Sequence, residues 1–164
     1  MPLLIGSETP QSTGIGANYL YSCKFTAGQS GTLEEIWVYS VGTGGVKAGI
    51  REDNAGSPGI LLDVNNTGTT CTGGQWNSIT LSGAVQIEQG TDYWLDILSN
   101  VSNAVTTSTT PGQGTIRYEA LSYSSGIPSS PPTWDGSLTY LCAVNGYGII
   151  ASTDRRGAKA PFGF

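Results

Sequence analysis

Apolar and polar residues alternate along much of the chain, most regularly between residues 15 and 25. Every second position there is apolar or aromatic: Ile15, Ala17, Tyr19, Tyr21, Cys23 and Phe25. Because successive side chains of a β-strand point to opposite faces, this period of two predicts a strand with one buried face.

A second strand is predicted within "GTLEEIWVYSVG". Alternation places Trp37, Tyr39 and Val41 on one face of this strand and Ile36 and Val38 on the other. Both faces therefore carry large apolar side chains, and the pattern alone leaves open which face is the inner one.

Seven further strands are predicted from short apolar runs separated by Gly, Asn, Asp or Pro. They cover residues 59–64, 75–81, 84–87, 92–98, 114–121, 137–144 and 147–152. The tandem Gly44 and Gly45 signal a hairpin after the second strand. No stretch has the i, i+3, i+4, i+7 spacing of a helix. About nine or ten strands without significant helix predict an all-β fold: a single-domain, two-sheet antiparallel β-sandwich of jelly-roll type.

The stretch "REDNAGSPGILL" has the composition of a bend between two strands. Asp53 and Asn54 suit a turn through side-chain hydrogen bonds to the backbone, Gly56 permits a positive φ, and Pro58 fixes its own φ. The alternative is a calcium site with oxygen ligands from Asp53, Asn54 and Asp63. Turn chemistry explains the same residues and no D-x-D-x-D-G loop is present, so we expect a structural bend and no cofactor.

Three segments within residues 46–98 follow the patterns "D-N-x-G-x-P-G-x-L-L", "G-x-W-x-x-x-x-L" and "V-x-I-x-x-G-T-x-Y-W-L". Together they resemble jelly-roll and carbohydrate-binding-module sandwiches of phage virion, tail-fibre and extracellular surface proteins. The resemblance implies the fold. It assigns no binding site, because the shared residues are turn and core residues.

The chain of 164 residues is long enough for one domain with a real hydrophobic core. We expect a sandwich domain over residues 1–154 and a basic, aromatic tail over residues 155–164. The tail carries three of the seven basic residues and none of the twelve acidic ones, so the domain has a net charge of −8 and the tail +3. An acidic body argues against nucleic acid as a partner, because phosphate binding needs a basic surface.

Catalytic chemistry has few candidates in this sequence. The absence of histidine removes the Ser-His-Asp and Cys-His arrangements. A glycosidase needs only two carboxylates, but the available ones lie at turns, at strand ends or on opposite faces of a strand: Glu34, Glu35, Glu52, Asp53, Asp92 and Asp96. We therefore expect no enzyme.

The three cysteines cannot all pair with one another, and no CxxC or Cys/His cluster suggests zinc. Cys23 and Cys142 lie in alternating apolar runs, where a free cysteine behaves as a small buried hydrophobe. We interpret both as free cysteines buried in the core, although the sequence does not decide whether any cysteine is oxidised.

Two long loops are predicted, over residues 99–114 and 122–137, and loops of this length are often functional. Trp134 lies in the second loop, which is rich in Pro and Ser, beside Asp135 and downstream of Tyr123. These three residues are the candidate ligand contacts, for example to a glycan; the alternative is that Trp134 folds back as a lid over the sandwich. The tryptophans in strands are interpreted as core: Trp37, Trp76 and Trp94.

The tail contains three cations and two aromatic residues that suit docking onto an acidic neighbour: Arg155, Arg156, Lys159, Phe162 and Phe164. The alternative is a solvated end. The first residues have neither the basic region of a secretory signal nor the length of a membrane span.

The sequence thus favours a non-enzymatic virion structural protein, a phage capsid decoration or tail-associated adhesion module. Such a protein would be made in the host cytoplasm, and it would form homo-oligomers, bind capsid or tail proteins, or do both. We expect it neither to bind nucleic acid nor to insert into a membrane. The alternative is a carbohydrate-binding module of a secreted, extracellular protein that contacts glycans through loop aromatics.

Overall fold

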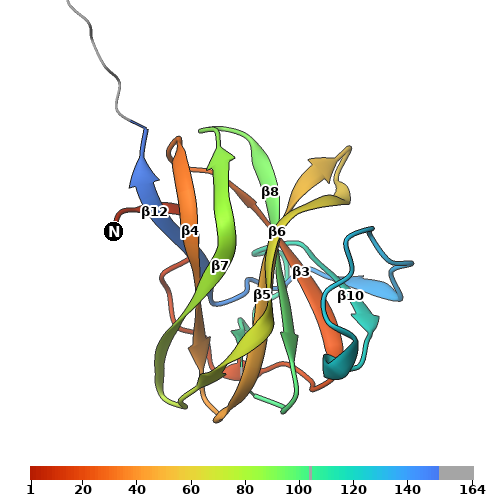
Figure 1. Ribbon diagram of the computed structural model, residues 1–164. Helices are drawn as coiled ribbons and strands as arrows, with labels where there is room; N and C mark the ends of the chain where they lie inside the picture. The colour runs from red at the N-terminus through yellow and green to blue at the C-terminus, as the bar shows by residue number, and fades with distance from the viewer. Residues whose placement is uncertain (104, 152–164) are drawn as a thin grey trace, which may run out of the picture.

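The computed structural model describes residues 1–103 and 105–151, and nearly all of its regular structure is β (Figure 1). The elements in the described residues are β1 (Leu3–Gly6), β2 (Thr13–Gly14), β3 (Tyr19–Thr26), β4 (Gly31–Ser40), β5 (Gly44–Asn54), β6 (Ser57–Cys71), β7 (Gln75–Ile87), β8 (Asp92–Ser99), β9 (Thr106–Thr107), β10 (Ile116–Ala120), the 3-10 turn η1 (Tyr123–Ser125), β11 (Gly136–Leu138) and β12 (Val144–Ile150).

Two antiparallel sheets pack face to face. One has four strands in the order β1-β12-β4-β7, and the other has six in the order β11-β10-β3-β8-β5-β6. Eight of these strands can be renumbered from one to eight in chain order: β1, β3, β4, β5, β6, β7, β8 and β12. Their order is then 1-8-3-6 in the first sheet and 2-7-4-5 in the second. This is the connectivity of a jelly roll, extended by β10 and β11 at the β3 edge. The predicted all-β sandwich is confirmed.

The core lies between the two sheets and follows the predicted alternation. Ile36 and Val38 on β4 face Leu95 and Ile97 on β8, and all four are fully buried. The residues that alternate with Ile36 and Val38 lie on the outer face of the four-stranded sheet and are half-buried. Burial of the aliphatic side chains therefore decides which face of β4 is the inner one.

The bend in "REDNAGSPGILL", residues 51–62, is structural, as predicted. β5 and β6 form a hairpin whose two turn residues are Ala55 and Gly56, both with positive φ (51° and 84°). Asn54 pairs with Ser57 across this turn, and Asp53 Oδ2 accepts a hydrogen bond from the Gly56 amide at 2.9 Å. Positive φ at both positions defines a type I′ turn, whose twist matches that of the strands.

Several strand boundaries differ from the sequence expectation. Gly44 and Gly45 do not form a hairpin, because β4 and β5 belong to different sheets. The runs 75–81 and 84–87 form one strand, β7, and an irregularity in its pairing with β4 absorbs the polar residues between them. The predicted strand over 137–144 is divided between β11 and β12. These differences arise from pairing between distant segments, which local alternation does not report.

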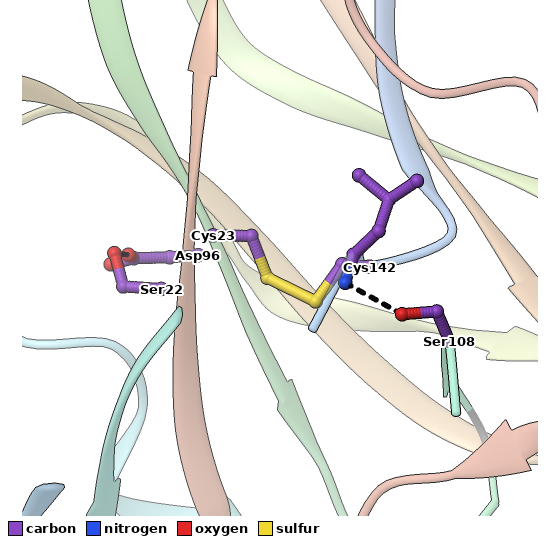
Figure 2. Close-up of a disulfide and its surroundings, with 6 residues drawn as sticks. Ser22, Cys23, Asp96, Ser108 and Cys142 are labelled. Carbon is purple, nitrogen blue, oxygen red and sulfur yellow. Dashed lines mark hydrogen bonds between the residues drawn. A yellow bond between two sulfur atoms is a disulfide. The ribbon is translucent and has the colours of Figure 1, made fainter. Parts of the chain in front are cut away.

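Cys23 and Cys142 form a disulfide in the core (Figure 2). The expectation of two free thiols is wrong, although both residues are buried as predicted. The bond joins β3 to the residues just before β12 and so connects the two sheets across a sequence separation of 119. Cys71 is free and buried. Alternation indicated that the cysteines face the core but not that they face each other.

Candidate functional site

The predicted loop site is folded onto the six-stranded sheet. Residues 122–135, called the covering loop below, lie over the outer face of β3 and β8, where Ile127 packs against Leu20 and Leu98. Trp134 and Tyr123 are half-buried and pack against the same cluster. Both rings thus help to hold the loop on the sheet. Their role in ligand binding stays a prediction.

Polar contacts fix the same loop. The Lys47 ammonium lies 4.5 Å from the centre of the Tyr123 ring and donates a hydrogen bond to the Tyr123 carbonyl at 2.8 Å. The Tyr123 amide donates to Asn18 Oδ1. Asp135 Oδ2 accepts a hydrogen bond from the Ala120 amide at 2.8 Å, so the Asp135 carboxylate also serves the local backbone.

A buried ion pair beneath the covering loop was not predicted from the sequence. Arg51 Nε lies 2.6 Å from Asp96 Oδ2, and neither side chain is exposed. Ser22 donates to the other Asp96 oxygen at 2.6 Å, and Figure 2 shows Ser22 and Asp96 on the side of β3 opposite to the disulfide. Burial raises the pKa of the Asp96 carboxyl, while Arg51 and Ser22 oppose that rise. Asp96 is therefore committed to the fold and is not placed to act as a glycosidase carboxylate.

Two of the three candidate calcium ligands, Asp53 and Asp63, already bind other groups of the protein. Asp53 accepts hydrogen bonds from Gly56 and from Trp94 Nε1, and lies 3.2 Å from the Lys24 ammonium. Asp63 accepts from the Val64 amide and from Gly83 on β7. Asn54 is exposed at the β5–β6 turn. Within residues 1–103 and 105–151, no group of three or more His, Cys, Asp or Glu side chains is arranged to hold a metal.

An open pocket of about 580 Å³ lies between the β5–β6 hairpin and the turn that joins β7 to β8. Its carboxylates are Glu52, Asp53 and Asp92, and Lys24 bridges the last two at 3.2 and 2.9 Å. Burial alone raises the pKa of Asp53, but hydrogen bonds from Gly56, Trp94 and Lys24 lower it overall. Hydrogen bonds from Thr26 and Lys24 lower the pKa of Asp92. The lysine thus already serves as the counter-ion of these two carboxylates.

The outer face of the four-stranded sheet carries a row of aromatic rings, called the aromatic row below. Its members come from three adjacent strands and are all half-buried: Tyr147 on β12, Trp37 and Tyr39 on β4, and Trp76 on β7. The Trp37 and Tyr147 rings meet edge to face at 5.6 Å, as do the Tyr39 and Trp76 rings. Trp37 and Tyr39 are two residues apart on one strand, about 7 Å. The four rings therefore form two edge-to-face pairs at neighbouring positions on one face of the sheet.

Two carboxylates flank one end of the aromatic row. Glu35 Oε2 accepts a hydrogen bond from Trp37 Nε1 at 2.8 Å, and Glu8 accepts one from the Tyr147 hydroxyl. Burial, together with Glu8, raises the pKa of Tyr147 to about 12. A hollow of about 200 Å³ lies between Trp37, Tyr147 and Met1. These contacts orient both rings.

No Lys or Arg side chain lies on the described part of this face. The basic residues within residues 1–103 and 105–151 all lie on strands of the six-stranded sheet: Lys24, Lys47, Arg51 and Arg117. Beside the aromatic row, Asn145 lies opposite Trp37 with its Oδ1 atom buried and without a hydrogen-bond partner among the described residues.

The sequence predicts that the tryptophans in strands belong to the core. This is right for Trp94, which is fully buried, and wrong for Trp37 and Trp76, which lie half-buried on the outer face of the four-stranded sheet. Alternation does not separate them, because Trp37 alternates with Ile36 and Val38 just as Trp94 alternates with Tyr93 and Leu95. The sequence does not show that a loop covers part of the outer face of the six-stranded sheet.

The proposed docking residues Arg155, Arg156, Lys159, Phe162 and Phe164 lie outside the described residues. Within the described part of the chain, no helix has the length and apolar character needed to cross a bilayer. Neither the protein-family models nor the curated proteins that were compared with this chain show a match.

Proposed function

We propose that this protein is a non-enzymatic structural protein of a virion, a capsid decoration or tail-associated adhesion module, which acts by assembly and surface display. The observation that carries the proposal is the disulfide between Cys23 and Cys142 in the core of a jelly roll. Disulfides persist in oxidising surroundings and are rare in the cytosol, so the bond supports a working life outside the cell.

The arrangement of carboxylates supports a role without catalysis. Asp96 is neutralised by Arg51, while Asp53 and Asp92 share Lys24. A glycosidase instead needs one carboxylic acid and one free carboxylate on either side of its substrate.

Assembly is tested by the native mass of the full chain. We expect a trimer or larger, and a monomer after deletion of residues 155–164, because the basic and aromatic tail would dock onto the acidic body of a neighbour. The matched control replaces the ten tail residues by a Gly/Ser segment of equal length. A full chain that stays monomeric would contradict assembly through the tail. Portal, capsid or tail genes beside its gene would support the virion assignment.

The second candidate is a carbohydrate-binding module of a secreted protein. The aromatic row favours it, because rows of partly exposed rings are typical of surfaces that hold flat ligands by stacking. Loop aromatics are less suited to this role than expected, since Trp134 and Tyr123 pack against Leu20 and Leu98.

A further inference from the structure

We propose that the aromatic row, Tyr147, Trp37, Tyr39 and Trp76, is a binding site for a neutral oligosaccharide chain. The inference rests on the adhesion role within the proposed function and names its ligand class and its residues. It differs from the glycan site predicted at Trp134, Tyr123 and Asp135, which lies on the other sheet.

The row is held in place before any ligand arrives. Its four rings project from β4, β7 and β12, whose inner side chains Ile36, Ile79 and Val144 are fully buried. Glu35 and Glu8 fix the orientation of Trp37 and Tyr147 through hydrogen bonds to their N–H and O–H groups. A ligand therefore pays little entropy for ordering these side chains.

Aromatic faces carry partial negative charge and attract C–H groups of partial positive charge. One face of a pyranose ring presents several such C–H groups, while its hydroxyls point outward from the rim. Stacking of sugar rings on Trp37, Tyr39 and Trp76 buries that apolar face and leaves the hydroxyls for polar partners. Because the two ring pairs span three adjacent strands on one face, the site fits a chain of sugars better than a monosaccharide.

The polar partners on this face are acceptors. Glu35 and Glu8 each use one oxygen for an aromatic donor, and no hydrogen bond to the second oxygen is found within the described residues. Those oxygens can accept hydrogen bonds from sugar hydroxyls, and hydrogen bonds to a charged acceptor are stronger than those between neutral groups. The hollow between Trp37, Tyr147 and Met1 gives one sugar ring or substituent a recess beside them.

Charge complementarity selects the ligand class. The face carries carboxylates, and the Lys and Arg residues of the described chain lie on the other sheet. An acidic polysaccharide would be repelled by Glu8 and Glu35. Single-stranded nucleic acid also stacks on aromatic rows, but it requires cations for its phosphates. A neutral glycan needs no such cations.

The experiment measures binding of the full chain by calorimetry to hexasaccharides of β-1,4-glucose, β-1,4-N-acetylglucosamine and α-1,4-glucose. Polygalacturonate and oligo-dT serve as anionic probes. We expect at least one neutral hexasaccharide to bind with a Kd below about 1 mM, and neither anionic probe to bind. Trp37→Ala and Trp76→Ala should each weaken binding by about tenfold or more. Trp37→Phe, which keeps a ring at this position, should retain most of the affinity.

Tyr19→Ala is the matched control, because it removes an exposed aromatic ring from the other sheet and should change the affinity by less than about twofold. The proposal is overturned if no neutral hexasaccharide binds, if Trp37→Ala and Trp76→Ala bind like the wild type while folded by circular dichroism, or if Tyr19→Ala abolishes binding. It is also overturned if an anionic probe binds at the row, or if the native mass falls in Trp37→Ala, which would identify an interface between copies. Binding and native mass are separate readouts, so loss of one leaves the test of the other intact.

Discussion

Arg51 on β5 and Asp96 on β8 form an ion pair from which solvent is excluded, with Nε and Oδ2 2.6 Å apart. The other guanidinium nitrogens donate to the carbonyls of Pro128, at 2.6 Å, and of Gly59 and Ser129. One side chain thus connects the middle of the six-stranded sheet to the covering loop. Loss of any one of these partners would leave a buried charge or polar group unpaired, which is costly. The network therefore favours a single arrangement of β5, β8 and the covering loop.

Asp96→Asn should lower the free energy of unfolding by about 3 to 5 kcal/mol, since the Arg51 charge would remain buried without its counter-ion. Arg51→Met combined with Asp96→Leu should cost clearly less than the sum of the two single substitutions, because it removes both charges. Urea denaturation of the wild type, of Asp96→Asn, Arg51→Met and Asp96→Leu, and of the double variant measures these values. A cost of Asp96→Asn no larger than that of the exposed substitution Glu88→Gln would contradict the role of the pair.

The disulfide makes a prediction about thiols and stability. Unfolded without reductant, the protein should expose one thiol, that of Cys71, and three after reduction. Replacing Cys23 and Cys142 together by Ala should lower the unfolding free energy by about 2 to 4 kcal/mol, because the bond closes a long loop in the unfolded chain. Thiol titration and thermal denaturation measure both. In the control Cys71→Ala, the thermal stability should still fall when reductant is added. Three reactive thiols in the unfolded protein before reduction would refute the bond.

The covering loop should be held mainly by its apolar contacts. Ile127→Ala removes a side chain that is 3% exposed, and we expect a loss of about 2 to 5 kcal/mol together with faster amide exchange in residues 122–135. Ile60→Ala is the matched control, because Ile60 is 62% exposed on the β5–β6 hairpin. Its effect should stay within about 0.5 kcal/mol. Equal effects of the two substitutions would show that the loop does not rest on this cluster.

The Lys24 contacts predict a pH dependence in acid. The pKa values of Asp53 and Asp92 are lowered from the ordinary 3.8 in the folded protein. Their contribution to stability is therefore present above about pH 4 and is lost as pH falls through the lower folded values. Because all three side chains are partly exposed, we expect less than about 1 kcal/mol. As the pH decreases, the unfolding free energy of Lys24→Met should fall less steeply than that of the wild type, measured by denaturation at each pH. An equal dependence on pH in the two proteins would exclude Lys24 as the cause.

The β5–β6 turn should accept a stabilising substitution. Ala55 has a φ of 51°, which costs a residue with a Cβ atom, and Asn is the preferred residue before Gly in a type I′ turn. Ala55→Asn should raise the unfolding free energy by about 0.5 to 1 kcal/mol, and Gly56→Ala, at a φ of 84°, should lower it by a similar or larger amount. Thermal denaturation compares them. A loss on Ala55→Asn would indicate a different turn conformation.

The alternation of apolar residues determined the fold class. The runs 15–25, 31–42 and 92–98 each predict a strand locally, because a period of two is a property of the backbone itself. The bend near Gly56 was equally predictable, since few residues adopt a positive φ. These features depend on neighbours in the chain and on little else.

Tertiary structure alone decided which residues meet. The pairing of Cys23 with Cys142, of Arg51 with Asp96, and of Tyr39 with Trp76 depends on strand order and on which sheet a covering loop protects. A strand with apolar residues on both faces, such as β4 or β8, has the same sequence pattern whether its outer face contacts a loop or solvent. Trp94 is fully buried and Trp37 only half-buried, although both alternate with inner aliphatic residues, because burial is a property of the whole packed chain.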